Sequence, residues 1–229
     1  MKRNIFLFSI LSATLLTLLA SCEIDNYPGP DATVSGQVID NATGKPIITE
    51  PYGFRIKMDE ISWQDNPVPR YINGYVDGSF NDKSYFGGTY VATAENGAFV
   101  VSASQTIDVK AKNTTTVNFN VNPYIRFDNV SIVKEGATVK ATFTLFKYVE
   151  SATPVDYAVI ANVNTPYFGM SDNQVSSGRI ALKDADFGEP IEVVLEGFVA
   201  GKTYHVRIAA YCTNSAGRYN YTEVVKIQM

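Results

Sequence analysis

The most constraining feature of this sequence is a strict alternation of apolar and polar residues over short segments. Val139, Ala141, Phe143 and Leu145 alternate with Lys140, Thr142 and Thr144. A period of two places the apolar side chains on one face of a β-strand and the polar side chains on the other. The same pattern recurs in residues 54–58, 71–76, 117–121 and 191–195. We therefore predict an all-β protein built from half-buried strands.

The composition points the same way. The chain has 14 Tyr, 13 Phe and 16 Gly; aromatic residues are enriched in strands, and glycine is typical of turns. Residues 157–163 are apolar except for Asn162, as in a central strand covered on both faces. Once an N-terminal signal is set aside, 208 of the 229 residues remain. This length suits two domains of about 100 residues each, so we expect two consecutive β-sandwiches.

The N-terminus has the layout of an export signal. The chain begins "MKRN" and is mostly apolar over residues 5–20. Residues 19–22 read "LASC", which ends at Cys22. A helix of about 24 Å over residues 5–20 is shorter than a bilayer core of about 30 Å, so the segment is predicted to be cleaved. "LASC" resembles the lipobox of bacterial lipoproteins. We predict a signal peptide over 1–21, lipid on Cys22 and a turn-rich tether over 22–31.

The residues that follow Cys22 suggest a final location. Glu23 and Asp25 resemble the acidic residues that accompany transfer of Bacteroidetes lipoproteins to the cell surface. The resemblance implies a protein that is lipid-anchored in the outer membrane and exposed at the cell surface.

Three motifs in residues 32–122 resemble a known module. "GQVIDNATGKPI" (36–47), "DGSF" (77–80) and "FGGTY" (86–90) look like the carboxypeptidase regulatory-like, transthyretin-like β-sandwich. In the first motif, Asp40 is expected to cap the amides of a turn in which Gly44 takes a positive φ. In carboxypeptidases this module is an accessory without catalytic residues, so the resemblance implies a fold and no active site.

Residues 123–229 resemble a second sandwich. "EGFVAGKTYHVRIAAYCTNSAGRYNYTEVVKI" (196–227) is similar to the E–F corner and the F and G strands of a fibronectin type III-like domain. Tyr204 lies where a tyrosine-corner hydroxyl would bond to the upstream chain. The alternation after it predicts that Val206, Ile208, Ala210 and Cys212 point inward and that His205, Arg207, Ala209 and Tyr211 point outward.

The order of a lipobox, a transthyretin-like sandwich and a fibronectin-like sandwich resembles an uncharacterised Bacteroidetes family of two-domain surface lipoproteins. Its members are associated with polysaccharide-utilisation systems. The resemblance implies a part in glycan capture or uptake and an outer-membrane transporter complex as a possible partner. It implies no catalytic or ligand-binding residue.

The residues themselves favour no enzyme chemistry. His205 is predicted on a solvated strand face and Cys212 on a buried one, so neither a catalytic triad nor a zinc site is expected. The pairs Asp59–Glu60, Asp184–Asp186 and Glu192–Glu196 are read as solvated acids, although the loop with Asp184 and Asp186 offers oxygen ligands for calcium. We predict no catalytic residue, no metal and no cofactor. After loss of Lys2 and Arg3 the net charge is about −6, which argues against nucleic-acid binding.

Aromatic residues that lie outside the inward positions of the predicted strands are the candidates for a binding site. Trp63 precedes two prolines and is followed by Tyr71 and Tyr75, while Tyr167 and Phe168 lie in a long polar connection. Exposed aromatic rings offer flat platforms to the apolar faces of sugars, and Gln64, Asp65 and Asn66 offer polar groups beside Trp63. The alternative is that these rings fill the ends of the sandwiches or pack between the two domains.

The sequence therefore predicts a non-catalytic surface lipoprotein that binds polysaccharide or oligosaccharide for an uptake system. Its expected partners are the membrane, through the lipid, and a glycan. The alternative is a structural or adhesive envelope protein, either a spacer or a pilus-like component, because two sandwiches on a tether also describe these. An exposed strand edge that accepts a partner's strand would favour that alternative.

Overall fold

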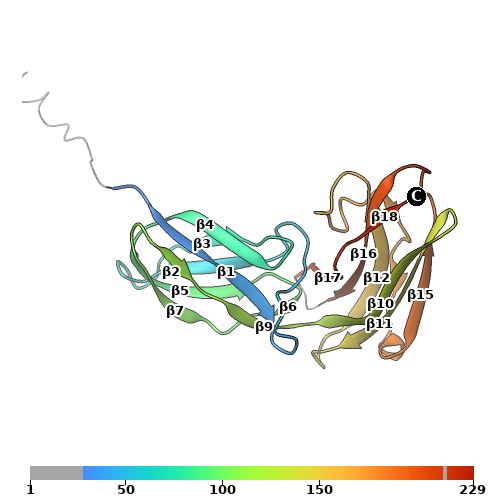
Figure 1. The fold of residues 1–229 in the computed structure, drawn as a ribbon. Coiled ribbons are helices and arrows are strands. Elements are labelled where there is room, and N and C mark those ends of the chain that lie inside the picture. The colour runs from blue at the N-terminus through green and yellow to red at the C-terminus, as the bar shows by residue number, and fades with distance from the viewer. Residues whose placement is uncertain (1–27, 214–215) are drawn as a thin grey trace, which may run out of the picture.

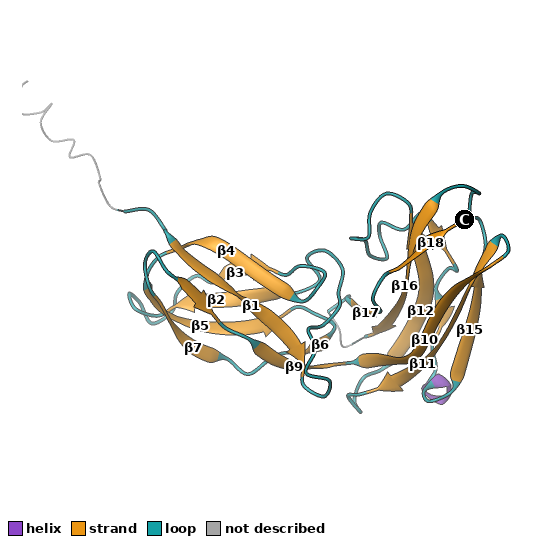
Figure 2. Cartoon of the chain, in the orientation of Figure 1, coloured by secondary structure: helices purple, strands orange, loops and turns teal. Residues whose placement is uncertain are grey.

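The computed structural model describes residues 28–213 and 216–229, which form two successive β-sandwiches (Figure 1). Strands dominate both halves, and the one short helix drawn among the described residues is the 3₁₀ turn η1 (Asp184–Asp186; Figure 2). The predicted all-β fold is confirmed. None of the described helical segments has the length and hydropathy of a membrane span.

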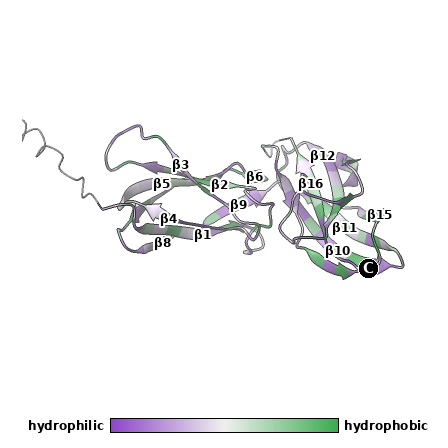
Figure 3. Ribbon diagram, turned by 90° about the horizontal axis from the view of Figure 1, so that it is seen from above, coloured by the Kyte–Doolittle hydropathy of each residue, from purple (hydrophilic) through white to green (hydrophobic). Residues whose placement is uncertain are grey.

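The N-terminal half contains nine strands in two sheets. They are β1 (Ala32–Asp40), β2 (Arg55–Glu60), β3 (Arg70–Asn73), β4 (Ser79–Tyr85), β5 (Gly88–Glu95), β6 (Phe99–Val100), β7 (Gln105–Val109), β8 (Thr114–Thr116) and β9 (Phe119–Pro123). One sheet has the order β4-β1-β9-β6 with β8 also paired to β1, and the other has the order β3-β2-β5-β7. Viewed from above, the two sheets lie as separate layers (Figure 3).

The core of this half lies between the two layers. Apolar side chains of alternate positions meet there, among them Val34 and Val38 from β1, Ile56 and Met58 from β2, and Phe119 from β9. The strand β1 is central, since it pairs antiparallel with β4 and parallel with both β8 and β9. Each alternating segment predicted in this half thus contributes its apolar side chains to an inner face of the sandwich.

The turn after β1 has the predicted chemistry. The Ala42 amide donates to Asp40 Oδ1 at 3.0 Å, and Gly44 has a φ of 68°, a value that glycine adopts without a steric cost. The turn returns the chain along β1, where the Ile47 amide donates to the Val38 carbonyl at 2.9 Å.

The C-terminal half contains the other nine strands. They are β10 (Ile125–Glu135), β11 (Thr138–Lys147), β12 (Pro154–Asn162), β13 (Val175–Ser176), β14 (Ile180–Ala181), β15 (Pro190–Leu195), β16 (Thr203–Cys212), β17 (Tyr219–Tyr221) and β18 (Val225–Gln228). One sheet has the order β10-β11-β15. The other has the order β13-β12-β16-β17, with β14 paired to β12 and β18 paired to β16.

The core of the C-terminal half is built as the alternation predicts. The inward positions of β11 and of β16 are buried in one cluster, which includes Phe143, Leu145, Val206 and Ile208. Tyr204 forms the predicted corner, because its hydroxyl accepts a hydrogen bond from the Val199 amide at 3.2 Å. Gly201, at the turn before β16, has a φ of 80°.

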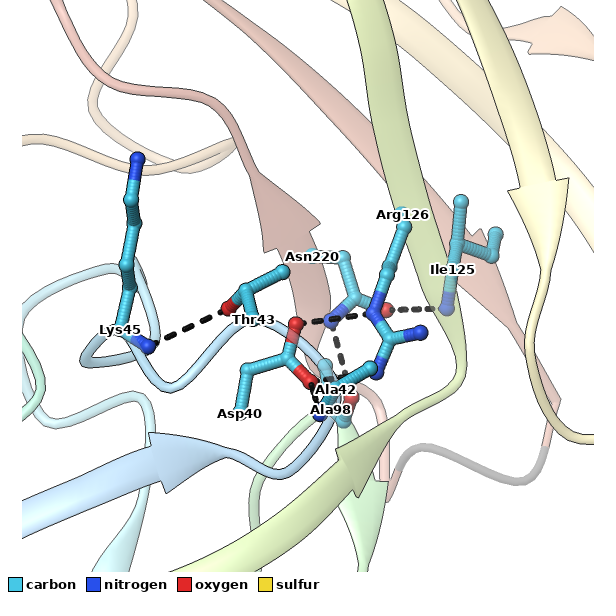
Figure 4. Close-up of polar contacts among 8 residues, drawn as sticks. All are labelled: Asp40, Ala42, Thr43, Lys45, Ala98, Ile125, Arg126 and Asn220. Atoms are coloured by element: carbon cyan, nitrogen blue, oxygen red, sulfur yellow. Dashed lines mark hydrogen bonds and ion pairs between the residues drawn. The ribbon is translucent and has the colours of Figure 1, made fainter.

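The two halves are joined by polar contacts near the crossover from β9 to β10 (Figure 4). Arg126 forms a two-bond ion pair with Asp40, in which Nε lies 2.8 Å from Oδ2. Asn220 links three segments: its Oδ1 accepts from the Ile125 amide at 3.1 Å and its Nδ2 donates to the Ala98 carbonyl at 2.9 Å. Strand β17 of the C-terminal half is thereby hydrogen-bonded to the N-terminal half as well.

A buried arginine forms a second link between the halves. Arg207 on β16 is 1% exposed; its Nη1 donates to the Phe168 carbonyl at 2.9 Å and its Nη2 to the Thr49 carbonyl, in the N-terminal half, at 3.0 Å. Its guanidinium lies 3.9 Å from the centre of the Tyr221 ring. Burial lowers the pKa of Arg207 to about 10, so the side chain keeps its charge at neutral pH.

Glu50 of the N-terminal half contacts the same tyrosine, Tyr221. Glu50 Oε2 accepts from the Tyr221 hydroxyl at 2.9 Å, and Oε1 lies 3.2 Å from Arg218 Nη1. Burial raises the pKa of the Tyr221 hydroxyl, which therefore stays protonated and donates. The contact between the halves is thus a packed and hydrogen-bonded interface.

Candidate functional site

A pocket of about 770 Å³ lies at the end of the N-terminal half where the described chain begins. Its walls come from the β2–β3 loop, the β4–β5 turn, the β7–β8 turn and residues 28–31. Its lining includes Trp63, Gln64, Val68, Phe86 and Lys112. The pocket therefore combines aromatic and apolar surface with polar groups, as small-molecule sites do.

The β2–β3 loop is held at its start by hydrogen bonds to β5. The Ile61 amide donates to the Thr89 carbonyl at 2.9 Å. The Ser62 hydroxyl accepts from the Thr89 amide at 2.6 Å, and the Ser62 amide donates to Glu60 Oε1 at 2.7 Å. The next residue, Trp63, is consequently presented from a fixed base with 75% of its surface exposed.

The floor and another wall of the pocket are held by hydrogen bonds and a ring contact. Tyr90 is buried, and its hydroxyl donates to the Phe86 carbonyl at 3.1 Å. Arg70 lies over the Tyr85 ring, 4.6 Å from its centre, and donates to the Ser84 carbonyl at 2.7 Å. These contacts leave Phe86 half exposed at the rim, facing the same space as Trp63.

Two carboxylates of the lining are already engaged by backbone amides. Glu60 accepts from the Ser62 amide, and Asp31 accepts from the Lys112 amide at 3.0 Å. Gln64, Arg70 and Lys112 also line the pocket, and their side chains carry hydrogen-bond donors from which an oxygen-rich ligand such as a sugar can accept. The arrangement thus offers an aromatic platform with hydrogen-bond donors beside it.

Of the five predicted aromatic residues, the structure brings only Trp63 into this pocket. Tyr71 lies on β3 with the guanidinium of Arg55 3.9 Å from its ring centre, so one ring face is covered. Tyr75 is exposed in the turn before β4, and Tyr167 is exposed in the C-terminal half. The predicted residues therefore do not form one continuous surface.

The prediction that Phe168 is an exposed platform is wrong. Phe168 is 0% exposed and packs with Ala158, Ile160 and Ala209 in a cluster that Ile48 of the N-terminal half also contacts. This is the alternative in which a ring packs between the domains. For the same reason Arg207 and Ala209 are buried, although the alternation predicted an outward direction for both.

The sequence reasoning missed Phe86 as a site residue. Phe86 was assigned to the "FGGTY" motif of the fold, yet its ring is half exposed beside Trp63. A large aromatic residue directly before two glycines is a signal that could have found it, because a tight turn seldom buries its own side chains.

The described residues contain little reactive chemistry. No three or more His, Cys, Asp or Glu side chains within them are grouped so that they could hold a metal ion. Asp184 pairs with Lys147 at 3.0 Å and Glu192 with Lys140 at 2.8 Å, so two of the acids considered above belong to surface ion pairs. Cys22, the predicted lipidation site, lies outside the described residues.

Cys212 provides a direct test of the core of the C-terminal half. The thiol is buried, and burial raises its pKa to about 11. In a protein that begins after Cys22 it is the one cysteine. We expect Ellman's reagent to leave the native protein almost unmodified at pH 8 and to modify one thiol rapidly in denaturant, because the thiolate is the reactive form. Rapid reaction of the native protein would contradict this burial.

The fold is similar to those of several crystal structures. A DUF3823 family protein from Bacteroides uniformis has a TM-score of 0.74 at 22% identity, and the match covers 87% of this chain and all of that one. A "putative carbohydrate binding protein" from the same species has a TM-score of 0.71 at 24% identity, covering 88% and 100%. A DUF3823 family protein from Parabacteroides merdae has a TM-score of 0.72 at 21% identity, covering 88% and 100%.

At these identities the similarity establishes the fold. No curated protein matches the chain. Residues 32–122 match the family model described as the N-terminal domain of a protein of unknown function, DUF3823. These residues resemble that domain, and the two-sandwich fold of the chain is similar to those of the DUF3823 proteins of Bacteroides and Parabacteroides.

Proposed function

We propose that this protein is a non-catalytic accessory of glycan uptake, held in the outer membrane by lipid on Cys22 and binding carbohydrate in the Trp63 pocket. The observation that carries the proposal is the pairing of two exposed aromatic rings, Trp63 and Phe86, with the polar groups of one pocket. Sugar rings have apolar C–H faces that lie on aromatic rings and hydroxyls that bond to such groups.

Two further points support this function. One structural relative at 24% identity is named a "putative carbohydrate binding protein". The pocket is also set on loops of a rigid sandwich, which is where binding residues are commonly placed.

The structural or adhesive alternative finds less support in the strand edges. In the N-terminal half, Gly74 and Phe80 form a bridge between the β3 and β4 segments, and the Thr115 hydroxyl of β8 donates to the Asp108 carbonyl of β7. The edge strand β10 has an irregular register between Asp128 and Ser131. Closed and irregular edges hinder the addition of a partner strand.

The test is the binding of carbohydrate to a protein that begins after Cys22 and contains both halves. Trp63 is the single tryptophan of the chain, so its fluorescence reports directly on the pocket. We expect retention on at least one polysaccharide gel and a change in Trp63 emission on titration with its oligosaccharide. Trp63→Ala should weaken affinity about tenfold or more, in the range of interface hot spots.

The matched control is Tyr167→Ala, which removes another ring that is 63% exposed but lies in the C-terminal half. Its affinity should equal that of the wild type. Equal losses in both variants would indicate nonspecific adhesion, and no retention on any of a broad panel of glycans would overturn the proposed function.

A further inference from the structure

The Trp63 pocket opens beside the point where the described chain begins. Pro28, Gly29 and Asp31 contribute to its lining together with Trp63 and Lys112. Figure 1 shows this point at the end of the N-terminal half that lies away from the C-terminal half. Whatever precedes Pro28 therefore leaves the fold at the rim of the pocket.

The chain length limits how far the pocket can lie from a lipid on Cys22. Five residues separate Cys22 from Pro28, and an extended chain spans at most about 3.5 Å per residue. The rim is then no more than about 20 Å from the lipidated residue. If Cys22 carries lipid, as proposed above, the pocket lies in the layer directly above the membrane.

The rim itself is strongly apolar. Val68 and Trp63, at 85% and 75%, have the two largest exposed fractions among the large hydrophobic side chains of the described residues. Ile61 in the same loop and Phe86 on another wall are also exposed. Exposed apolar groups gathered at one end of a soluble fold mark an interaction surface, and tryptophan is favoured at the boundary between lipid and water.

The lining of the pocket also includes polar side chains, because Gln64, Arg70 and Lys112 contribute to it beside the apolar residues. A hydrocarbon chain leaves such groups without a partner, which costs free energy. A saccharide accepts their hydrogen bonds. An apolar rim beside a pocket that also carries polar side chains therefore fits a molecule with a sugar portion next to a lipid portion.

We propose that the pocket binds the saccharide portion of a glycolipid in the membrane that holds the protein, while Ile61, Val68 and the edge of Trp63 contact the lipid beside it. This inference rests on the proposed function, since it names the class of carbohydrate for the same site. In this arrangement the C-terminal half points away from the membrane.

The test measures flotation with vesicles, using unlipidated protein that begins after Cys22 so that the anchor makes no contribution. One set of vesicles contains phosphatidylethanolamine and phosphatidylglycerol, and a second set contains the same lipids with rough lipopolysaccharide. We expect flotation with the second set and at least about tenfold less with the first. Brominated acyl chains in the second set should quench the emission of Trp63.

Ile61→Ser separates the two parts of the proposal, because Ile61 is an exposed apolar residue of the rim and is not among the residues that line the pocket. It should reduce flotation with the glycolipid vesicles and leave affinity for the delipidated core oligosaccharide unchanged. Tyr167→Ala should change neither.

The other outcomes are distinct. Binding of free oligosaccharides without flotation would overturn this inference and leave the proposed function standing. Equal flotation with both vesicle sets would show that the rim binds lipid alone and would also overturn it. No binding to any saccharide or vesicle would overturn both proposals.

Discussion

Replacing Arg207 with alanine is expected to lower the free energy of unfolding by about 3–5 kcal/mol, because two buried carbonyls lose their donors at about 1–3 kcal/mol each and the packing of the side chain is lost. The carbonyls of Thr49 and Phe168 would lose their donors, and the Tyr221 ring would lose the guanidinium that covers it. For a chain of this size each kcal/mol lowers the Tm by about 2–4 °C. Differential scanning calorimetry measures the loss, and separation of one transition into two would show that the halves are uncoupled.

Arg55→Ala is the matched control. The guanidinium of Arg55 also lies 3.9 Å from a tyrosine ring, that of Tyr71, and pairs with Glu95 at 2.6 Å. Its side chain is 37% exposed, and exposed ion pairs contribute about 1 kcal/mol or less. If Arg207→Ala were no more destabilising than Arg55→Ala, the buried link between the halves would not hold them together.

A single methyl group at Gly36 is expected to disrupt the N-terminal half. A Cβ built on Gly36 would lie 1.7 Å from the Val117 carbonyl oxygen and 2.8 Å from Cζ of Phe80. The carbonyl cannot retreat, because Val117 lies between β8 and β9, and both of these strands pair with β1. We expect Gly36→Ala to cost about 3 kcal/mol or more, at the upper end of overpacking effects. The midpoint of urea unfolding, followed by circular dichroism, measures it.

Gly29→Ala is the control for this variant. A Cβ at Gly29 would meet nothing within 4 Å, and its φ is not in the left-handed region. Its urea midpoint should match that of the wild type. A Gly36→Ala protein with an unchanged midpoint would mean that β1 and the Val117 segment are farther apart than described here.

Local patterns predicted the strands and their turns well, because these depend on neighbouring residues. The alternation around Phe143 matches β11, the Asp40 turn has its cap and its positive φ at Gly44, and the Tyr204 hydroxyl makes the expected bond. In each case a period of two or a short-range hydrogen bond determines the structure.

The errors came from contacts between residues far apart in the sequence. Alternation indicates that Arg207 and Ile208 face opposite sides of β16, but it does not reveal that both sides are covered. Arg207 is buried because Thr49, 158 residues earlier, lies against it. Phe168 is buried by the same interface between the halves. A charged residue in a central strand can be buried when carbonyls of another domain receive its hydrogen bonds.

The candidate site was predicted in part. A lone tryptophan before two prolines indicated an exposed loop, and Trp63 is exposed. Its neighbours in the pocket, Phe86 and Lys112, come from two other turns. Which turns meet at one end of a sandwich depends on the sheet order, and residue spacing alone does not give that order.

The parallel pairing of β1 has a consequence for the order in which the chain can fold. Val38 pairs with Phe119, so the first strand finds this partner only after some eighty further residues have been synthesised. Contacts of such long sequence separation form slowly. Until then the backbone donors and acceptors on this side of β1 have no strand partner, and an unpaired edge of this kind can accept a strand from another chain.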